Sequence, residues 1–133
     1  MSEMIGLLIV SHSSKAAEGI REIAMEMGGD AETIAAVGGD PDGGIGSSID
    51  EIRAALADLL ERVDGVVLLA DLGSAVMNAE TAIEMLESDA DVVVADAPIL
   101  EGALNAAAST TSPKATVESV KESAEEARDI SKV

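Results

Sequence analysis

Ile5-Gly6-Leu7-Leu8-Ile9-Val10-Ser11-His12-Ser13-Ser14 is the stretch that decides the fold, an apolar run that stops at the only histidine of the chain. A short run of Ile, Leu and Val that ends in small polar residues is typical of a strand buried on both faces of a parallel sheet. His12 is then expected just past the carboxyl end of that strand. The two serines after it favour the start of a helix, so the imidazole should lie beside exposed backbone N–H groups, which attract anions.

A lone histidine is more often structural or simply solvated than functional. Its expected place at the carboxyl end of a strand favours function, because open α/β sheets bind their ligands there. His12 is therefore the candidate around which the rest of the chain is interpreted.

The composition limits what the protein can be. The chain has 133 residues, which predicts one domain spanning residues 1–133. It has no Phe, Tyr or Trp, so its core must consist of Ala, Val, Ile, Leu and Met. It has no cysteine, which excludes disulfides, thiolate catalysis and cysteine-based metal sites. Glu3 stands where a signal peptide carries positive charge, and no apolar run approaches the roughly 20 residues needed to span a bilayer, so we expect a soluble cytoplasmic protein with no membrane partner.

The formal net charge is −18, against a magnitude of about 2–8 for an ordinary small domain. Such acidity makes nucleic acid and anionic membranes unsuitable partners. The carboxylates are dispersed along the chain and do not form one tail, which favours a solvated acidic surface over a face for a single basic partner. We therefore expect a halophilic protein, since about 1 M salt shortens the range of charge repulsion to about 3 Å.

Downstream of the first strand, helical and strand patterns alternate. We expect helices over about residues 14–27, 47–63, 75–87 and 98–108, and strands over about 33–37, 66–70 and 92–95. Ser48 followed by Glu51 predicts a capping box, and Pro98 suits the first turn of a helix. The expected buried face of the first helix consists of Ile20, Ile23, Ala24 and Met27. A final helix is expected to start at Ser112-Pro113 and to lie on the outside, with one face made of Val117, Val120, Ala124, Ala127 and Ile130.

The alternation of strand and helix predicts an α/β fold, because right-handed crossovers generate a parallel sheet with helices on both faces. For a chain of this length we expect a three-layer sandwich with four strands in the order 2-1-3-4. The strand order then reverses between the first and third strands. His12 and Asp71 follow these two strands, so the two side chains should face each other in the crevice where such folds bind ligands.

The glycine-rich turn over residues 38–48 resembles a phosphate-binding loop only superficially. The lysine that follows the last glycine of a nucleotide-binding P-loop is missing, and Asp40 and Asp42 would repel a polyphosphate. A structural turn that borders the site is the better interpretation, because its glycines permit backbone conformations closed to other residues.

A histidine beside an aspartate has a definite chemistry. A carboxylate that accepts the N–H of one ring nitrogen leaves the other nitrogen with a free lone pair and stabilises positive charge on the ring. A protease-like triad is disfavoured because no nucleophile-elbow pattern occurs, and one histidine makes a metal site improbable, although Asp71 and Asp96 offer carboxylates to magnesium. A phosphohistidine uses all of these features. The backbone groups near the following residues are expected to hold the phosphoryl oxygens: Ser13, Ser14, Gly73 and Ser74.

Four segments in order resemble a known family: residues 10–13, residues 43–48, residues 71–80 and residues 97–103. They are similar to the phosphotransferase subunit of phosphoenolpyruvate-dependent dihydroxyacetone kinase, which itself resembles the IIA domain of mannose-type sugar phosphotransferase systems. The resemblance covers about residues 4–105. It implies that His12 is phosphorylated through Nε2, that Asp71 binds the other ring nitrogen, and that the chain forms a homodimer.

The resemblance also implies partners. The phosphoryl group is expected to come from an HPr-like phosphocarrier protein and to pass to ADP on the nucleotide-binding subunit of the kinase, while dihydroxyacetone is bound on a third subunit. No cofactor is expected on this chain itself, and the donors, which some relatives carry on the same chain, are expected to be separate proteins. Two alternatives stay open, a IIA component of a mannose-type sugar transporter and a non-catalytic regulator with the same fold. The segment at residues 71–78 favours the kinase subunit over the transporter.

The dispersed charge generates a first prediction. The melting temperature should rise as monovalent salt increases from about 0.1 M to above 1 M, because screening weakens the repulsion between surface carboxylates. Far-UV circular dichroism can follow unfolding in a chain without aromatic reporters. A melting temperature that does not respond to salt would contradict the high-salt interpretation.

Overall fold

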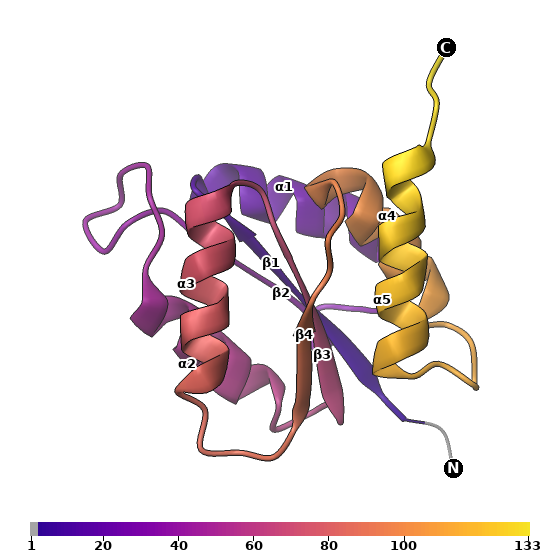
Figure 1. The fold of residues 1–133 in the computed structure, drawn as a ribbon, viewed down its shortest axis with the longest axis horizontal. Helices are drawn as coiled ribbons and strands as arrows, with labels where there is room; N and C mark the ends of the chain where they lie inside the picture. Colours follow the sequence, from indigo (N-terminus) through magenta and orange to yellow (C-terminus); the bar gives the residue numbers. More distant parts are fainter. Residues whose placement is uncertain (1–2) are drawn as a thin grey trace.

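The fold is a parallel sheet between two layers of helices (Figure 1), described here for residues 3–133 of a computed structural model. In chain order the elements are β1 (Ile5–Ser11), α1 (Ser14–Met25), β2 (Ile34–Gly38), α2 (Ile49–Leu59), β3 (Gly65–Ala70), α3 (Gly73–Glu84), β4 (Asp91–Val94), α4 (Ile99–Ser109), α5 (Val117–Glu125) and the 3-10 helix η1 (Glu126–Asp129). The strands pair in the order β2-β1-β3-β4, all parallel. The predicted topology is confirmed.

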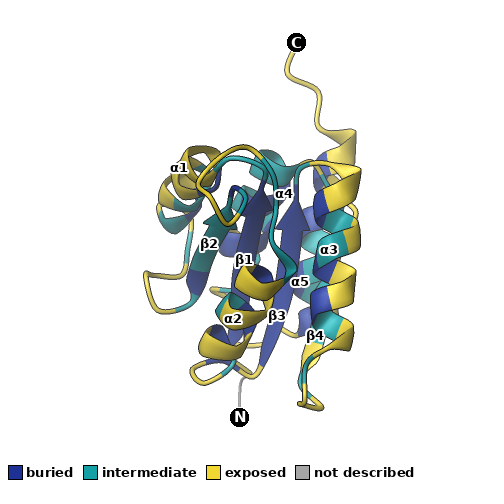
Figure 2. Ribbon diagram, turned by 90° about the vertical axis from the view of Figure 1, so that its left-hand side faces the viewer, coloured by how far each residue is buried: buried dark blue, intermediate teal, exposed yellow. Residues whose placement is uncertain are grey.

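The two central strands are buried along their whole length, as their apolar sequences predict. Every residue of β1 and β3 is buried. They pair in register from Ile5 with Gly65 to Val10 with Ala70. This register brings the residues that follow both strands to the same edge of the sheet, where the arrowheads of β1 and β3 end in Figure 2.

Side chains of β1 alternate between the two layers, as the two-residue period of a strand requires. Leu7 and Ile9 belong to the core under α1, α4 and α5, while Leu8 and Val10 belong to the core under α2 and α3. Figure 1 shows these two groups of helices on opposite faces of the sheet. The C-terminal helix α5 packs beside α4, and its residues Val117, Val120 and Ala124 are buried in the same core.

Alanine contributes much of the core, which contains no aromatic residue. Fully buried alanines lie on the inner faces of the helices: Ala17, Ala24, Ala75, Ala79, Ala82, Ala103, Ala106, Ala107 and Ala124. Such short side chains let helices approach the sheet and each other closely. A Cβ on Gly28 would fall on the carbonyl oxygen of Ala107 in α4, which illustrates how near the end of α1 lies to that helix.

This close approach corrects the predicted face of the first helix. Ala24 is buried as predicted and Ile20 packs partly buried against the core, whereas Ile23 and Met27 are exposed. Ala17, which lies seven residues before Ala24, is buried in addition. The helix also ends at Met25, two residues earlier than expected.

The predicted start of the last helix is wrong. Ser112 and Pro113 lie in the turn after α4, and α5 begins at Val117. Thr116 and Ser119 form a complete capping box, in which each side chain accepts the backbone N–H of the other residue. This box satisfies two N–H groups at once and therefore fixes the start. Ile130 is exposed, since η1 ends at Asp129 before it.

The observed ends of other helices differ from the predicted ends by a few residues. The helix expected at 47–63 ends at Leu59, and only half of its predicted capping box forms, through the N–H of Glu51 and the hydroxyl of Ser48. The helix expected at 75–87 runs from Gly73 to Glu84. Because α3 starts two residues earlier than predicted, Gly73 and Ser74 belong to its first turn.

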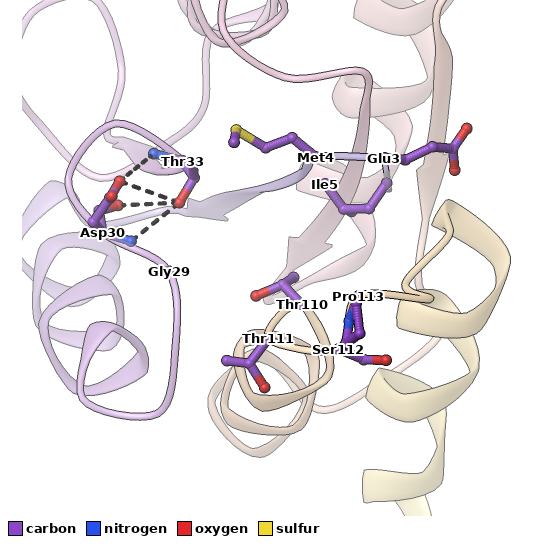
Figure 3. Close-up of a pocket in the computed structure, with 10 residues that line it drawn as sticks. All are labelled: Glu3, Met4, Ile5, Gly29, Asp30, Thr33, Thr110, Thr111, Ser112 and Pro113. Carbon is purple, nitrogen blue, oxygen red and sulfur yellow. Dashed lines mark hydrogen bonds between the residues drawn. The ribbon is translucent and has the colours of Figure 1, made fainter. Parts of the chain in front are cut away.

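A cavity of about 360 Å³ lies at the amino end of the sheet, opposite the end that carries His12 (Figure 3). Asp30 and Thr33 line it and hold each other through hydrogen bonds in the turn before β2. None of the helices within the described residues has the length and apolarity to span a bilayer.

Two helical glycines provide a matched test of the packing. A Cβ on Gly19 in α1 would meet nothing within 4 Å, while one on Gly102 in α4 would meet Ala97 Cβ and Leu69 Cδ2, both at 2.8 Å. We expect Gly19→Ala to raise the free energy of unfolding by about 0.5–1 kcal/mol, and Gly102→Ala to lower it by about 1–3 kcal/mol. Urea denaturation followed by circular dichroism measures both, and equal effects would contradict the described packing.

Candidate functional site

The ends of β1 and β3 bring the imidazole of His12 against the carboxylate of Asp71. His12 Nδ1 lies 2.9 Å from Asp71 Oδ1, and the side chains are 18% and 22% exposed. The backbone N–H of Asp71 donates to the carbonyl of Val10, so the parallel ladder itself holds the two segments together. The predicted meeting of these two side chains is present in the structure.

Asp71 is held by more than the imidazole. Its Oδ2 accepts hydrogen bonds from the Ser11 hydroxyl at 2.8 Å and from the backbone N–H of His12 at 3.0 Å. Partial burial by itself would raise the pKa of Asp71. The hydrogen bonds from the backbone and side chain of His12 and from Ser11 together outweigh burial and lower this pKa below its usual value. The carboxylate is therefore ionised and fixed in orientation at neutral pH.

An ionised Asp71 determines where the proton of the imidazole sits. The ionised carboxylate can accept hydrogen bonds but cannot donate them. In the neutral ring, Nδ1 therefore carries the hydrogen and Nε2 keeps its lone pair. Ser74 Oγ lies 2.6 Å from Nε2 and donates its hydroxyl hydrogen to that lone pair. His12 thus presents a nucleophilic nitrogen, Nε2, toward the first turn of α3.

Two helices begin beside the imidazole. Ser13 caps α1, its hydroxyl accepting the N–H of Ala16, and Leu72 precedes α3 without a side-chain cap. The four predicted phosphate-binding residues therefore have different surroundings. Ser74 contacts Nε2 directly, and Ser14 and Gly73 are the first residues of α1 and α3. The N–H of Ser13 already donates to the Ser11 hydroxyl.

The glycine-rich turn borders the site, in agreement with its predicted structural role. The N–H of Gly46 donates to the carbonyl of His12 at 2.9 Å. Gly39 and Gly43 have φ angles of 83° and 87°, in the left-handed region that glycine adopts without strain. Asn78 Nδ2 of α3 donates to Ser47 Oγ at 2.6 Å, which ties the turn to α3.

Ser11 is the functional residue that sequence reasoning missed. It is 2% exposed and is the only buried polar or charged residue in the described part of the chain. Its hydroxyl links Asp71 to the N–H of Ser13. A signal was present in the sequence, because a polar residue that ends a strand buried on both faces needs a hydrogen-bond partner.

Metal chemistry finds little support in the described residues, which contain no group of three His, Asp or Glu side chains able to hold an ion. Asp96 binds Arg128, with 3.0 Å between Oδ2 and Nη1, and Asp71 binds His12. The two carboxylates considered for magnesium are thus each paired within the protein. What the site does offer is one nucleophilic nitrogen with an oriented partner and two adjacent helix starts.

Comparison with known proteins places these features in a family. The family model EIIA-man, described as PTS system fructose IIA component, matches residues 6–121. A phosphoryl donor subunit DhaM of PEP-dependent dihydroxyacetone kinase 2 from Listeria innocua is 38% identical over 78% of this chain and 84% of its own length. The phosphotransferase subunit DhaM of a PTS-dependent dihydroxyacetone kinase from Lactococcus lactis is 34% identical over 90% of this chain and 93% of its own length. The crystal structure of phosphotransferase system component EIIA from Streptococcus agalactiae has the same fold, with a TM-score of 0.70 and 22% identity. The match covers 93% of this chain and 92% of that one.

The lowered pKa of Asp71 has a consequence for stability. A carboxyl group with a depressed folded-state pKa stabilises the fold above its unfolded value of about 3.9, and this contribution is lost as the pH falls through the folded value. Asp71→Asn should therefore lower the free energy of unfolding at pH 7 by about 1–3 kcal/mol. The difference from the unmodified chain should begin to shrink as the pH falls below about 3.9, and it should disappear only below the lower folded-state pKa of Asp71, where both side chains are neutral. Urea titrations at pH 7 and at lower pH, at constant salt, would reveal a pH-independent difference if this assignment were wrong.

Proposed function

The chain belongs to the EIIA-man family, and on that basis we propose that it is the phosphoryl donor subunit of a phosphoenolpyruvate-dependent dihydroxyacetone kinase. The observation that carries the proposal is the pairing of His12 Nδ1 with Asp71 at 2.9 Å, which leaves Nε2 free to act as a nucleophile. The site is the phosphocarrier centre in this proposal, and His12 is its phosphorylated residue.

The first step is transfer from the phosphohistidine of an HPr-like phosphocarrier protein. The lone pair of His12 Nε2 attacks the phosphorus, a new N–P bond forms, and the N–P bond to the donor's imidazole breaks. The electron pair of that bond returns to the donor ring. The proton on Nδ1 stays in place, and the positive charge that develops on the His12 ring is stabilised by the Asp71 carboxylate.

The residues around Nε2 prepare this step. The Ser74 hydroxyl occupies the lone pair of Nε2 in the resting protein, so it rotates away as the phosphoryl group arrives and can then donate to a phosphoryl oxygen. The first N–H groups of α3, at Gly73 and Ser74, and of α1, at Ser14, lie at helix starts that favour a dianion. These dipoles offset part of the repulsion that a chain of net charge −18 exerts on phosphate.

The second step returns the phosphoryl group to a nucleotide. A terminal phosphate oxygen of ADP, bound on the nucleotide-binding subunit of the kinase, attacks the phosphorus in line with the bond to Nε2, which breaks to regenerate neutral His12 and yield ATP. Dihydroxyacetone is bound on a third subunit. This chain therefore acts as a carrier between proteins, and we propose that it does so in the cytoplasm as a homodimer.

A second candidate function is the IIA component of a sugar transporter. It is favoured by the description of the matching family, which names a fructose phosphotransferase component. In that role the phosphoryl group would pass from His12 to a IIB protein. The relatives that are named as dihydroxyacetone kinase subunits favour the kinase role.

Phosphorylation at His12 is the primary prediction. Incubation with phosphoenolpyruvate, enzyme I and an HPr-like protein should add one acid-labile, base-stable phosphoryl group per chain, which intact-mass measurement detects. His12→Ala should abolish the addition. Label that persists in His12→Ala would contradict the assignment, and a chain that never accepts phosphate would be the non-catalytic regulator.

The Asp71 carboxylate should determine the transfer rate. We expect Asp71→Ala to slow phosphorylation of His12 by a factor on the order of 100, because the proton on Nδ1 and the developing charge lose their partner. Far-UV circular dichroism should show that the variant keeps its fold. An unchanged transfer rate would mean that Asp71 does not orient the imidazole.

The acceptor separates the two candidate functions. The phosphorylated chain should generate ATP rapidly with the nucleotide-binding kinase subunit loaded with ADP, and it should leave a mannose-type IIB protein unlabelled. Luminescent detection of ATP and intact-mass measurement of the IIB protein provide the two readouts. The reverse pattern would make this chain a transporter component.

A further inference from the structure

The buried hydroxyl of Ser11 takes no part in the two transfer steps described above. Ser11 ends β1 and is 2% exposed, so its hydroxyl is closed off from a partner protein. It nevertheless makes two hydrogen bonds, one with the side chain of Asp71 and one with the backbone of Ser13. A buried hydroxyl between a reactive pair and a helix start is a candidate for a positioning role.

The hydrogen of this hydroxyl has one direction available to it. Ser11 Oγ accepts the N–H of Ser13 at 3.1 Å, and a backbone N–H can only donate. The hydroxyl hydrogen is therefore directed to Asp71 Oδ2, which lies 2.8 Å away and, when ionised, can only accept. The hydroxyl thus fixes Oδ2 relative to the end of β1 and the start of α1.

The backbone of Ser11 is itself held on both sides. Ser11 pairs with Gly38 at the end of β2, and Val10 before it pairs with Ala70 of β3. A Cβ on Gly38 would lie 2.6 Å from the carbonyl oxygen of Ser13 and 2.8 Å from that of Ser11, so the end of β2 packs closely against this segment. The hydroxyl therefore projects from a part of the backbone that has little room to move.

The carboxylate of Asp71 needs such an anchor, because it rotates about its Cβ–Cγ bond when nothing holds it. Oδ1 lies 2.9 Å from His12 Nδ1, while Oδ2 accepts from the Ser11 hydroxyl and from the N–H of His12. Without the hydroxyl, one backbone N–H alone would hold Oδ2. The lone pair of Nε2 depends on the orientation of the carboxylate, since the bond from Nδ1 to Oδ1 selects the tautomer in which Nε2 carries no hydrogen.

We propose that Ser11 is a positioning residue that acts through Asp71. Its hydroxyl holds the carboxylate in the orientation that keeps the hydrogen of His12 on Nδ1 and the lone pair on Nε2. The kinetic consequence rests on the proposed function, whereas the tautomer of the ring is a property of the resting protein. Loss of the hydroxyl should therefore slow the transfer step and leave the affinity for the donor protein unchanged.

Three variants test this role. Ser11→Ala removes the hydroxyl, and Ser11→Cys fills nearly the same space with a thiol that donates only weakly, so that packing is kept while the hydrogen bond is lost. Thr116→Ala is the control, because it also removes a hydroxyl that accepts a backbone N–H near a helix start. That helix, α5, starts beside Gly65, at the opposite end of β3 from Asp71.

The first readout is NMR spectroscopy of the chain labelled with the heavy nitrogen isotope in histidine, because His12 is its only histidine. In mildly alkaline solution, where the ring is neutral, the unmodified chain and Thr116→Ala should show Nδ1 protonated and Nε2 unprotonated. In Ser11→Ala and Ser11→Cys the two signals should move toward each other, because both tautomers are then populated. Unchanged ring signals in these variants would overturn the proposal.

The second readout is phosphorylation of His12 by the purified phosphorylated HPr-like protein. Ser11→Ala should lower kcat about tenfold, because one hydrogen bond to an ionised carboxylate is lost, and it should leave KM within about twofold. Ser11→Ala added to Asp71→Ala should change the rate by less than about twofold, since the two residues act as one unit. If the two losses multiply instead, Ser11 acts independently of Asp71 and the proposal fails. Thr116→Ala should transfer at the rate of the unmodified chain.

The two readouts distinguish this inference from the proposed function. A chain that never accepts phosphate but shows the expected ring signals contradicts the proposed function and supports the positioning role of Ser11. A chain that accepts phosphate, and whose Ser11→Ala variant keeps the full kcat, contradicts the role of Ser11 alone.

Discussion

The carboxylate of Asp71 joins the sheet to the reactive side chain. It accepts hydrogen bonds from the imidazole and the backbone N–H of His12 and from the hydroxyl of Ser11, so both of its oxygens are occupied. These donors come from the end of β1, while Asp71 itself comes from the end of β3. The arrangement exists because the two strands are parallel and in register, with Val10 opposite Ala70. A shift of one residue would turn the side chains at these ends to opposite faces of the sheet.

The core shows how an aliphatic chain can hold such a register without aromatic residues. The strands β1 and β3 are buried on both faces. The helices α1, α3 and α4 cover them mainly through alanines, while α2 packs through one isoleucine and two leucines. Short side chains bring backbones close together, which compensates for the missing bulk. The same close packing makes the core intolerant of larger side chains, because a single added Cβ at Gly102 meets two side chains at 2.8 Å. The site is therefore built at the ends of two closely packed, buried strands.

The net negative charge of the chain opposes the binding of a phosphoryl group. A chain of net charge −18 is a poor environment for a dianionic phosphoryl group. At the site, however, α1 and α3 begin beside the imidazole, and the carboxylate of Asp71 accepts three hydrogen bonds, which offset part of the effect of its charge. The overall acidity is dispersed over the chain, and salt screens its effect at longer range. Local dipoles at the two helix starts therefore matter more for a phosphoryl group than the net charge does.

The sequence alone determined the strand that precedes His12, the alternation of strands and helices, the strand order 2-1-3-4 and the pairing of His12 with Asp71. These features depend on periodicity and on the rule that parallel strands end at one edge, both of which can be read from residue order. Only the tertiary structure decided that Ser11 is buried against Asp71, that Ser74 lies 2.6 Å from Nε2, and that Ile23 and Met27 face solvent. Distances of this kind depend on strand register, on the rotation of each helix about its axis and on the gap between helices. Those quantities arise from contacts between segments 60 or so residues apart, as Ser11 and Asp71 are, and a local pattern does not contain them.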